Sequence, residues 1–169
     1  LHLSLRRQRQ MCIRDRAYVD GLIDYECVAQ GTLAERLRAA GSGLGGFFTP
    51  TGYGTLLAQG KETRVIKGVG YVFEEPLHAD YALVKAYRAD PLGNLVYRKA
   101  GRNFGPLMCM ASATAIVQVH ALAEVGGLDP EHIVTPGIFV QRVLRIPDAQ
   151  LTGACLLYTS PSPRDLSTS

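Results

Sequence analysis

Short apolar runs alternate with turn-forming residues through the middle of this chain, and the pattern predicts strands mixed with short helices. Residues 81–88 (YALVKAYR) and 115–119 (AIVQV) are largely apolar, as in the buried strands of a parallel sheet. Residues 63–66 and 71–74 flank turn-forming residues at 67–70 and predict a hairpin. We therefore expect an α/β fold with an open, largely parallel sheet.

Proline and cap signals predict the remaining elements. Pro106 fits the first turn of a helix over residues 106–113, because proline lacks the N–H that this turn leaves unpaired. Thr32 and Glu35 have the spacing of a capping box, so a helix is expected to start at Thr32 and to end at Gly41. We also expect the end of a helix at 17–23, strands at 24–29, 95–98 and 138–144, a turn at 90–94, and a short turn or helix from 129.

Two features before the hairpin are candidates for a binding role. Six glycines lie between residues 41 and 54, and glycine lets a backbone approach a ligand closely, although a long connection with several turns explains them equally. Gln30 lies where the expected strand at 24–29 meets the next helix. A glutamine amide and helix-start N–H groups there can donate to a developing oxyanion. An ordinary surface glutamine fits the same pattern, so both interpretations stay open.

The chain has 169 residues, enough for one domain with one core, and we place that domain at residues 17–150. The flanking segments 1–16 and 151–169 are expected to be non-native or disordered. Their strings MCIRDR and CLLYTSPSPRD resemble translated sequencing-adaptor sequence, although a basic arm and a flexible tail also fit. These ends hold six of the 18 basic residues and two of the 15 acidic ones, so the basic balance predicts no nucleic-acid partner.

Several other classes of protein and site are disfavoured. No apolar run approaches the roughly 20 residues that span a bilayer, and no secretory signal is visible, so no membrane association is expected. The four cysteines and four histidines are dispersed, which predicts neither a metal site nor a disulfide framework. A reducing cytoplasm is the simplest location. Cys109, between two methionines, is expected to be a core residue rather than a nucleophile.

Three long strings carry a family resemblance: QGTLAERLRAAGSGLGGFFTPTGYGTLLAQGKETR at 30–64, ADYALVKAYRADPLGNLVYRKAGRNFGPLMCMA at 79–111, and VTPGIFVQRVLRIP at 134–147. Over about residues 17–147, the chain resembles the A subunit of 3-oxoacid CoA-transferases. That group includes succinyl-CoA:3-oxoacid, 3-oxoadipate and acetate CoA-transferases. The resemblance implies a three-layer α/β/α fold with an open, mostly parallel sheet that is incomplete here at its N-terminus.

The same resemblance implies a mechanism and a partner. A glutamate of a separate B subunit would carry CoA as a thioester in a ping-pong reaction. The B subunit would form a heterodimer or heterotetramer with this chain. CoA, an acyl-CoA such as succinyl-CoA and a 3-oxoacid would be substrates, with no metal and no permanently bound cofactor. The resemblance places Gln30 at the reacting thioester and indicates Gly31, Thr49 and Gly52 as residues that bind substrate or CoA.

The chain departs from the family pattern at Ala29, where proline is usual, and at 42–45, where SGLG replaces Ala-Gly-Ile-Pro. Residues 71–80 and the string RKAGRNFGP at 98–106 resemble 3-oxoadipate enzymes more than acetoacetate enzymes. Two alternatives stay open. A non-enzymatic ligand-sensing domain would share the fold, since fold alone does not decide function. A fragment without a function of its own would also fit.

Overall fold

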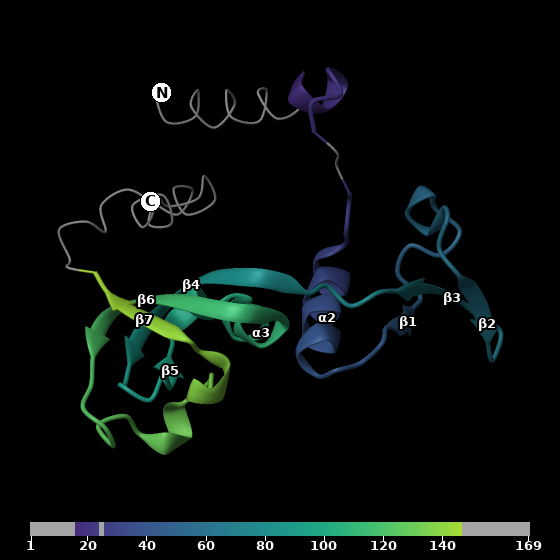
Figure 1. Cartoon of the computed structure of the whole chain (residues 1–169). Coiled ribbons are helices and arrows are strands. Elements are labelled where there is room, and N and C mark those ends of the chain that lie inside the picture. The colour runs from purple at the N-terminus through teal and green to yellow at the C-terminus, as the bar shows by residue number, and fades with distance from the viewer. Residues whose placement is uncertain (1–15, 24–25, 147–169) are drawn as a thin grey trace, which may run out of the picture.

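The computed structural model describes residues 16–23 and 26–146. They form two sheets together with the helices α2 (Gln30–Gly41) and α3 (Gly105–Ala111), which pack against each other (Figure 1). The larger sheet has the strand order β5-β4-β6-β7, and the smaller one has the order β1-β3-β2. Among the described residues, no helix is long and apolar enough to cross a membrane.

The larger sheet is built around two long parallel strands, β4 (Ala79–Ala89) and β6 (Ser112–Leu122). β7 (Arg142–Arg145) is a third parallel strand beside β6, whereas the short β5 (Leu95–Val96) runs antiparallel to β4. The chain passes from β4 to β6 through β5 and α3, because parallel neighbours need a crossover connection. The predicted α/β class with a largely parallel sheet is confirmed.

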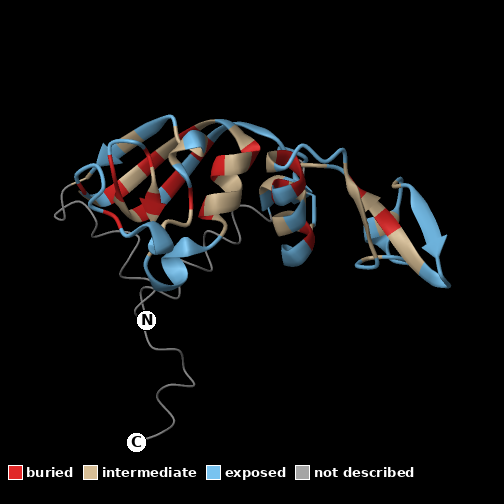
Figure 2. Ribbon diagram, turned by 90° about the horizontal axis from the view of Figure 1, so that it is seen from below, coloured by how far each residue is buried: buried red, intermediate tan, exposed pale blue. Residues whose placement is uncertain are grey.

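Described residues cover only one face of the larger sheet. Val84 on β4 and Val117 on β6 are buried on the face toward α3, where Cys109 packs against them. On the opposite face, Tyr81 and Leu83 are 67% and 75% exposed, and Figure 2 shows the resulting alternation of buried and exposed residues. The expectation of a fully buried strand at 81–88 is therefore wrong here, because successive strand residues point to opposite faces and no described helix covers the second one.

The smaller sheet projects beyond α2, away from the larger sheet (Figures 1 and 2). It consists of β1 (Phe47–Thr49), β2 (Thr63–Ile66) and β3 (Val69–Glu74), all antiparallel. β2 and β3 form the predicted hairpin. Its turn is tighter than the predicted 67–70, because Lys67 and Gly68 alone connect the strands, both with positive φ.

The start of α2 differs from the predicted capping box. The helix begins at Gln30, two residues before Thr32, and its N-cap residue Ala29 makes no side-chain cap hydrogen bond. Thr32 is buried within the first turn, while Glu35 pairs with Arg38 at 2.7 Å. The capping-box prediction is therefore wrong. The Thr32 side chain is buried and does not cap the helix, and Glu35 forms an ion pair with Arg38 instead of bonding back to the helix start.

The glycine at the end of α2 serves helix packing rather than termination. Gly41 is the last helical residue, as predicted, but the left-handed residue that turns the chain is Gly43, with a φ of 69°. A Cβ at Gly41 would lie 2.5 Å from the Cβ of Met110 on α3. The absent side chain therefore lets α2 and α3 approach closely, and Leu37 packs at the same contact.

The remaining predictions have mixed outcomes. Segment 26–29 belongs to no strand, so the strand at 24–29 is wrong for its described part, and residues 24–25 lie outside the described residues. The strand at 138–144 is shorter than predicted, because Gly137–Phe139 form a 3-10 helix and β7 begins at Arg142. The predicted turn at 90–94 is confirmed, with the Asp90 carboxylate accepting hydrogen bonds from Asn94. The 3-10 helix Pro130–His132 and helical residues at 16–19 also agree.

Candidate functional site

The first turn of α2 presents free backbone donors. The first intrahelical hydrogen bond runs from the N–H of Leu33 to the carbonyl of Ala29 at 2.9 Å, so the N–H groups of Gln30, Gly31 and Thr32 precede it. No acidic residue lies in this turn. The positive end of the helix dipole is therefore not compensated by a nearby carboxylate of the helix, and it can attract an anion or an oxyanion.

Gln30 is the first residue of this helix and not the last residue of a strand. The sequence-based placement at a strand end is therefore wrong, because segment 26–29 pairs with no strand. Gln30 is exposed, and among the described residues its side-chain amide makes no hydrogen bond. The two N–H groups and the carbonyl oxygen of this amide are thus available to a ligand or another chain.

Gly31 lies beside Gln30 and is also exposed. A Cβ added at Gly31 would meet no atom within 4 Å, so packing inside the described part of the chain does not require glycine there. The open space leaves the helix start accessible at Gly31. That arrangement fits a position that a ligand or a partner chain approaches closely.

Thr49 and Gly52 shape the loop that connects β1 to the hairpin. The Thr49 hydroxyl accepts a hydrogen bond from the N–H of Thr51 at 3.3 Å, and the Gly52 carbonyl accepts one from the Thr55 hydroxyl at 2.7 Å. Gly52 has a φ of 87°, which a residue with a side chain adopts only under strain. Both predicted residues therefore have a clear local role in forming residues 49–57, which we call the 49–57 loop.

A narrow cavity of about 10 Å³ separates the start of α2 from this loop. Ala29 and Thr32 line one side, and Thr51 and Leu57 line the other. The structure thus brings the first turn of α2 and the 49–57 loop together. None of the four predicted site residues lines the cavity itself, but each lies next to residues that do.

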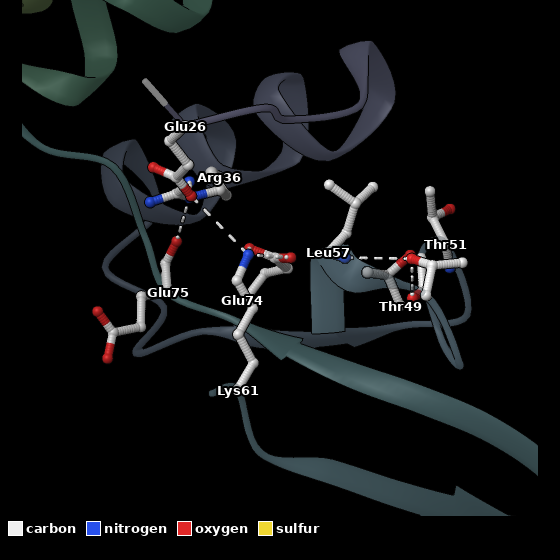
Figure 3. Close-up of polar contacts among 10 residues, drawn as sticks. Glu26, Arg36, Thr49, Thr51, Leu57, Lys61, Glu74 and Glu75 are labelled. Carbon is white, nitrogen blue, oxygen red and sulfur yellow. Dashed lines mark hydrogen bonds and ion pairs between the residues drawn. The ribbon is translucent and has the colours of Figure 1, made fainter. Parts of the chain in front are cut away.

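A cluster of four charged side chains lies beside the same cavity, and the sequence analysis did not predict it. Glu26, Arg36, Lys61 and Glu74 converge from the segment before α2, from α2 itself and from the two sides of the hairpin (Figure 3). A signal for one pair was present. Extending the hairpin register from Thr63↔Val72 by two residues places Lys61 opposite Glu74.

The larger hollow of the described chain lies elsewhere. It has a volume of about 430 Å³ and lies at the beginning of β4 and β6, where His78, Asp80 and Ser112 line it. Ligands of open α/β sheets bind outside the opposite, carboxyl ends of parallel strands. Its lining residue Met110 lies against Gly41 at the C-terminal end of α2, the opposite end from Gln30, so this hollow does not form part of the candidate site.

The cysteines and other metal-binding residue types add no second site. Among the described residues, no group of three or more histidine, cysteine, aspartate or glutamate side chains could hold a metal ion. Cys27 and Cys109 are both free thiols, and Cys12 and Cys155 lie outside the described residues. Burial raises the pKa of Cys109 to about 11, so it remains a thiol near neutral pH. The prediction that Cys109 is a core residue is confirmed by its exposure of 1%.

Comparisons with known proteins agree on the family. Residues 12–145 match the family described as Coenzyme A transferase. The A subunit of the 3-oxoadipate CoA-transferase of Pseudomonas putida is 62% identical over 146 residues, which cover 86% of this chain and 63% of that protein. The A subunit of the succinyl-CoA:3-ketoacid coenzyme A transferase of Xanthomonas campestris is 51% identical over 130 residues, which cover 77% of this chain and 54% of that protein.

A solved structure with the same fold is named for a different reaction, decarboxylation. The crystal structure of a variant of the decarboxylase AibA/AibB superposes with a TM-score of 0.66 and 27% identity, over 81% of this chain and 52% of that one. This chain therefore spans between about half and two thirds of the length of these proteins. Since the family match covers most of the chain, the protein belongs to the coenzyme A transferase family.

Proposed function

We propose that this chain is part of the A subunit of a two-subunit CoA-transferase, which moves CoA from succinyl-CoA to 3-oxoadipate. The observation that carries the proposal is the exposed pair Gln30-Gly31 at an uncompensated helix start, in a chain 62% identical to the A subunit of a 3-oxoadipate CoA-transferase. The B subunit is the proposed partner and supplies the glutamate nucleophile. CoA and its esters enter as substrates, and no resident cofactor is needed for this chemistry.

In the proposed reaction, the glutamate carboxylate attacks the thioester carbonyl of the acyl-CoA. The carbonyl oxygen becomes an oxyanion, CoA leaves as a thiolate, and a mixed anhydride forms. The thiolate then attacks the glutamyl carbonyl, the first acid leaves as a carboxylate, and a glutamyl-CoA thioester remains. The acceptor acid repeats both steps in reverse, so no proton, electron or water is consumed.

This chain would contribute hydrogen bonds to the oxyanions of these steps. The Gln30 amide offers two N–H donors, and the N–H groups of Gly31 and Thr32 lie in the same turn. Donors of this kind stabilise the transition state more than the ground state, because the carbonyl oxygen gains charge only as the reaction proceeds. The 49–57 loop, with Thr49 and Gly52, would form the opposite wall of the substrate path.

A hybrid protein provides the test. Residues 17–146 of this chain would replace the aligned segment of the Pseudomonas putida relative, and the hybrid would be purified together with a B subunit. We expect transfer of CoA from succinyl-CoA to 3-oxoadipate, faster than to acetoacetate, followed by the absorbance of the enol thioester. Mass spectrometry should find a CoA adduct on the B subunit but none on the hybrid.

Other outcomes would identify a different function. Release of carbon dioxide from an acyl-CoA, without transfer, would point to a reaction like the one named for the AibA/AibB decarboxylase. Tight ligand binding without any turnover in a folded heteromer would favour the ligand-sensing alternative. A preference for acetoacetate would keep the transferase proposal but change the acceptor.

The free thiol of Cys27 fits the reducing cytoplasm that we propose as the location.

A further inference from the structure

The projecting sheet and α2 are connected through loops and through the four-residue charge cluster. Arg36 lies at the centre of this connection, and its side chain is only 13% exposed. Its Nε–H donates to the carbonyl of Glu75 at 2.9 Å, and its Nη1 group donates to the carboxylate of Glu26 at 3.0 Å. The backbone carbonyl of Arg36 also accepts a hydrogen bond from the N–H of Leu77 at 3.0 Å.

Arg36 therefore holds two segments onto one helix. On one side it fixes residues 75–77, through which the chain leaves β3. On the other side it fixes Glu26, four residues before Gln30. The two hydrogen bonds leave a planar guanidinium from different nitrogens, and a lysine ammonium at the end of a flexible stem cannot hold the same pair of directions.

The second half of the cluster fixes the hairpin. The Lys61 ammonium donates to both carboxylate oxygens of Glu74, at 2.8 and 3.0 Å. The Glu74 side chain is only 7% exposed, and a buried carboxylate needs a paired cation. Lys61 also lies 3.8 Å from Glu26, so Glu26 connects the Arg36 side of the cluster with the Lys61 side.

The cluster borders the cavity at the candidate site. Lys61 and Glu74 line it together with Thr51 of the 49–57 loop and Ala29 at the start of α2. Any change in the cluster would shift the projecting sheet, and with it the loop, relative to Gln30. Misplacement of a reacting group by about 1 Å can cost on the order of 100-fold in rate.

We propose that Arg36 is a positioning residue, which acts with Glu26, Lys61 and Glu74 to set the 49–57 loop against the first turn of α2. This inference rests on the function proposed above, since it assigns Gln30 to the reacting centre. In this role Arg36 acts through the loop and the helix, and not on the substrate directly. Its loss therefore lowers the turnover number more than it raises the Michaelis constant for succinyl-CoA.

The test compares three variants in the hybrid heteromer. Arg36→Met removes both side-chain hydrogen bonds, and Glu26→Gln weakens the same link from an exposed position. Arg38→Met is the matched control, because Arg38 is on the same helix but, within the described residues, pairs only with Glu35 on the surface. We expect kcat to fall about 10- to 100-fold in Arg36→Met and less in Glu26→Gln, and to stay within about twofold in Arg38→Met.

The double variant of Arg36 and Glu26 sharpens the result. Because both substitutions break one link, their effects on kcat should not multiply. Equal kcat values for Arg36→Met and Arg38→Met would overturn the inference, as would a loss confined to KM. Should Arg36→Met fail to fold, Glu26→Gln carries the same test, since the Glu26 side chain is 59% exposed and Arg36 keeps its hydrogen bond to the Glu75 carbonyl.

Hydrogen exchange separates this inference from the proposed function. If the parent hybrid folds with its partner but transfers no CoA, the proposed function fails. The contact between Arg36 and Glu26 can then still be tested in the full 169-residue chain. Amide exchange at residues 26–33 should be faster in Arg36→Met than in Arg38→Met, and identical exchange in the two variants would overturn the positioning role of Arg36.

Discussion

The larger and the smaller sheet of this protein are stabilised in different ways. Around β4 and β6, the buried residues form one continuous apolar cluster, which includes Leu95 and Val117 at 0% exposure. In the strands of the smaller sheet, only Val72 and Glu74 are buried, and Glu74 is a charged residue paired with Lys61. The first region is a packed core, and the second depends on turns, hydrogen bonds and ion pairs.

The difference matters because the 49–57 loop of the candidate site belongs to the second region, and the start of α2 lies beside it. A region with few buried apolar contacts opens locally at a lower free energy than a packed core does. The start of α2 and the 49–57 loop can therefore adjust to a substrate or a partner while the larger sheet stays folded. The larger sheet thus supplies most of the stability, and the start of α2 and the 49–57 loop carry the candidate site. Substitutions in the two places should therefore affect stability and turnover separately.

The largest expected effect concerns the chain by itself. Neither region supplies the glutamate nucleophile of the proposed mechanism, so the purified chain should show no transfer between succinyl-CoA and 3-oxoadipate. The measurement is the enol-thioester absorbance, and the hybrid together with its B subunit serves as the positive control. Turnover by the chain without any partner would show that the nucleophile has been assigned to the wrong protein.

The next effect tests the start of α2. Gln30→Ala in the hybrid heteromer should lower turnover by about 100- to 1,000-fold, the usual loss for one oxyanion donor, with little change in KM for the CoA ester. Gln59→Ala is a suitable control, because Gln59 is also an exposed glutamine but caps the 3-10 helix Leu56–Ala58 and is not part of the first turn of α2. A loss of about threefold or less, roughly 0.7 kcal/mol, would reduce Gln30 to a surface residue.

A pair of core substitutions compares the two regions directly. Leu95→Ala should destabilise the whole chain by about 2–5 kcal/mol, because Leu95 is fully buried beside β4. Val72→Ala truncates the one buried apolar side chain in the strands of the smaller sheet and should accelerate amide exchange there, while the exchange of β4 and β6 stays slow. Equal acceleration in both sheets after Val72→Ala would mean that the protein unfolds as one cooperative unit.

The same contrast explains what could be predicted from the sequence. Residues 81–88 and 115–119 are recognisable as strands because short, largely apolar runs lie between turn-forming residues, and β4 and β6 do pair in parallel. The hairpin follows from its turn residues. In these segments, local pattern and tertiary packing act in the same direction, so a sequence-based interpretation works.

The predictions failed where contacts between distant segments decide the structure. Thr32 has the spacing of a cap, but packing places it inside the helix. Arg36 contacts Glu26 and Glu75, and the second partner is 39 positions away, which no local pattern reveals. The expected covering of both sheet faces came from the apolar run at 81–88 and from the family resemblance, whereas no described helix covers the face that carries Tyr81 and Leu83.

Alkaline pH should weaken the core through two neighbouring groups. Burial raises the pKa of Tyr97 from 10.0 to about 12, and burial likewise raises that of Cys109 from 9.0 to about 11. The folded chain therefore holds protons that the unfolded chain releases, and this stabilisation is complete below pH 9 and declines as the pH rises through these folded values. The melting temperature should fall from about pH 9, where the unfolded thiol starts to lose its proton, until the folded thiol and phenol also titrate at about pH 11 and 12.

A substitution tests whether these two groups cause the decline. Cys109→Ala removes one of them, so its melting temperature should fall less steeply over the same pH range, although it starts lower because a buried side chain is lost. The hydrogen bond of 3.0 Å between the hydroxyls of Tyr97 and Thr135 would remain in this variant. An unchanged slope would assign the pH dependence to other groups.

The smallest effect is expected from the two ends of the chain. The composition of segments 1–16 and 155–169 predicts no apolar face, so deleting both should leave the melting temperature within about 2 °C of the parent. The family match begins at residue 12, which makes a second deletion, of residues 1–11 alone, informative. Arg16 pairs with Asp20 at 4.0 Å, and the Arg16 side chain is 85% exposed, so its loss should cost little. If removal of residues 1–16 destabilises the chain while removal of residues 1–11 does not, residues 12–16 belong to the domain, and its boundary lies before residue 17.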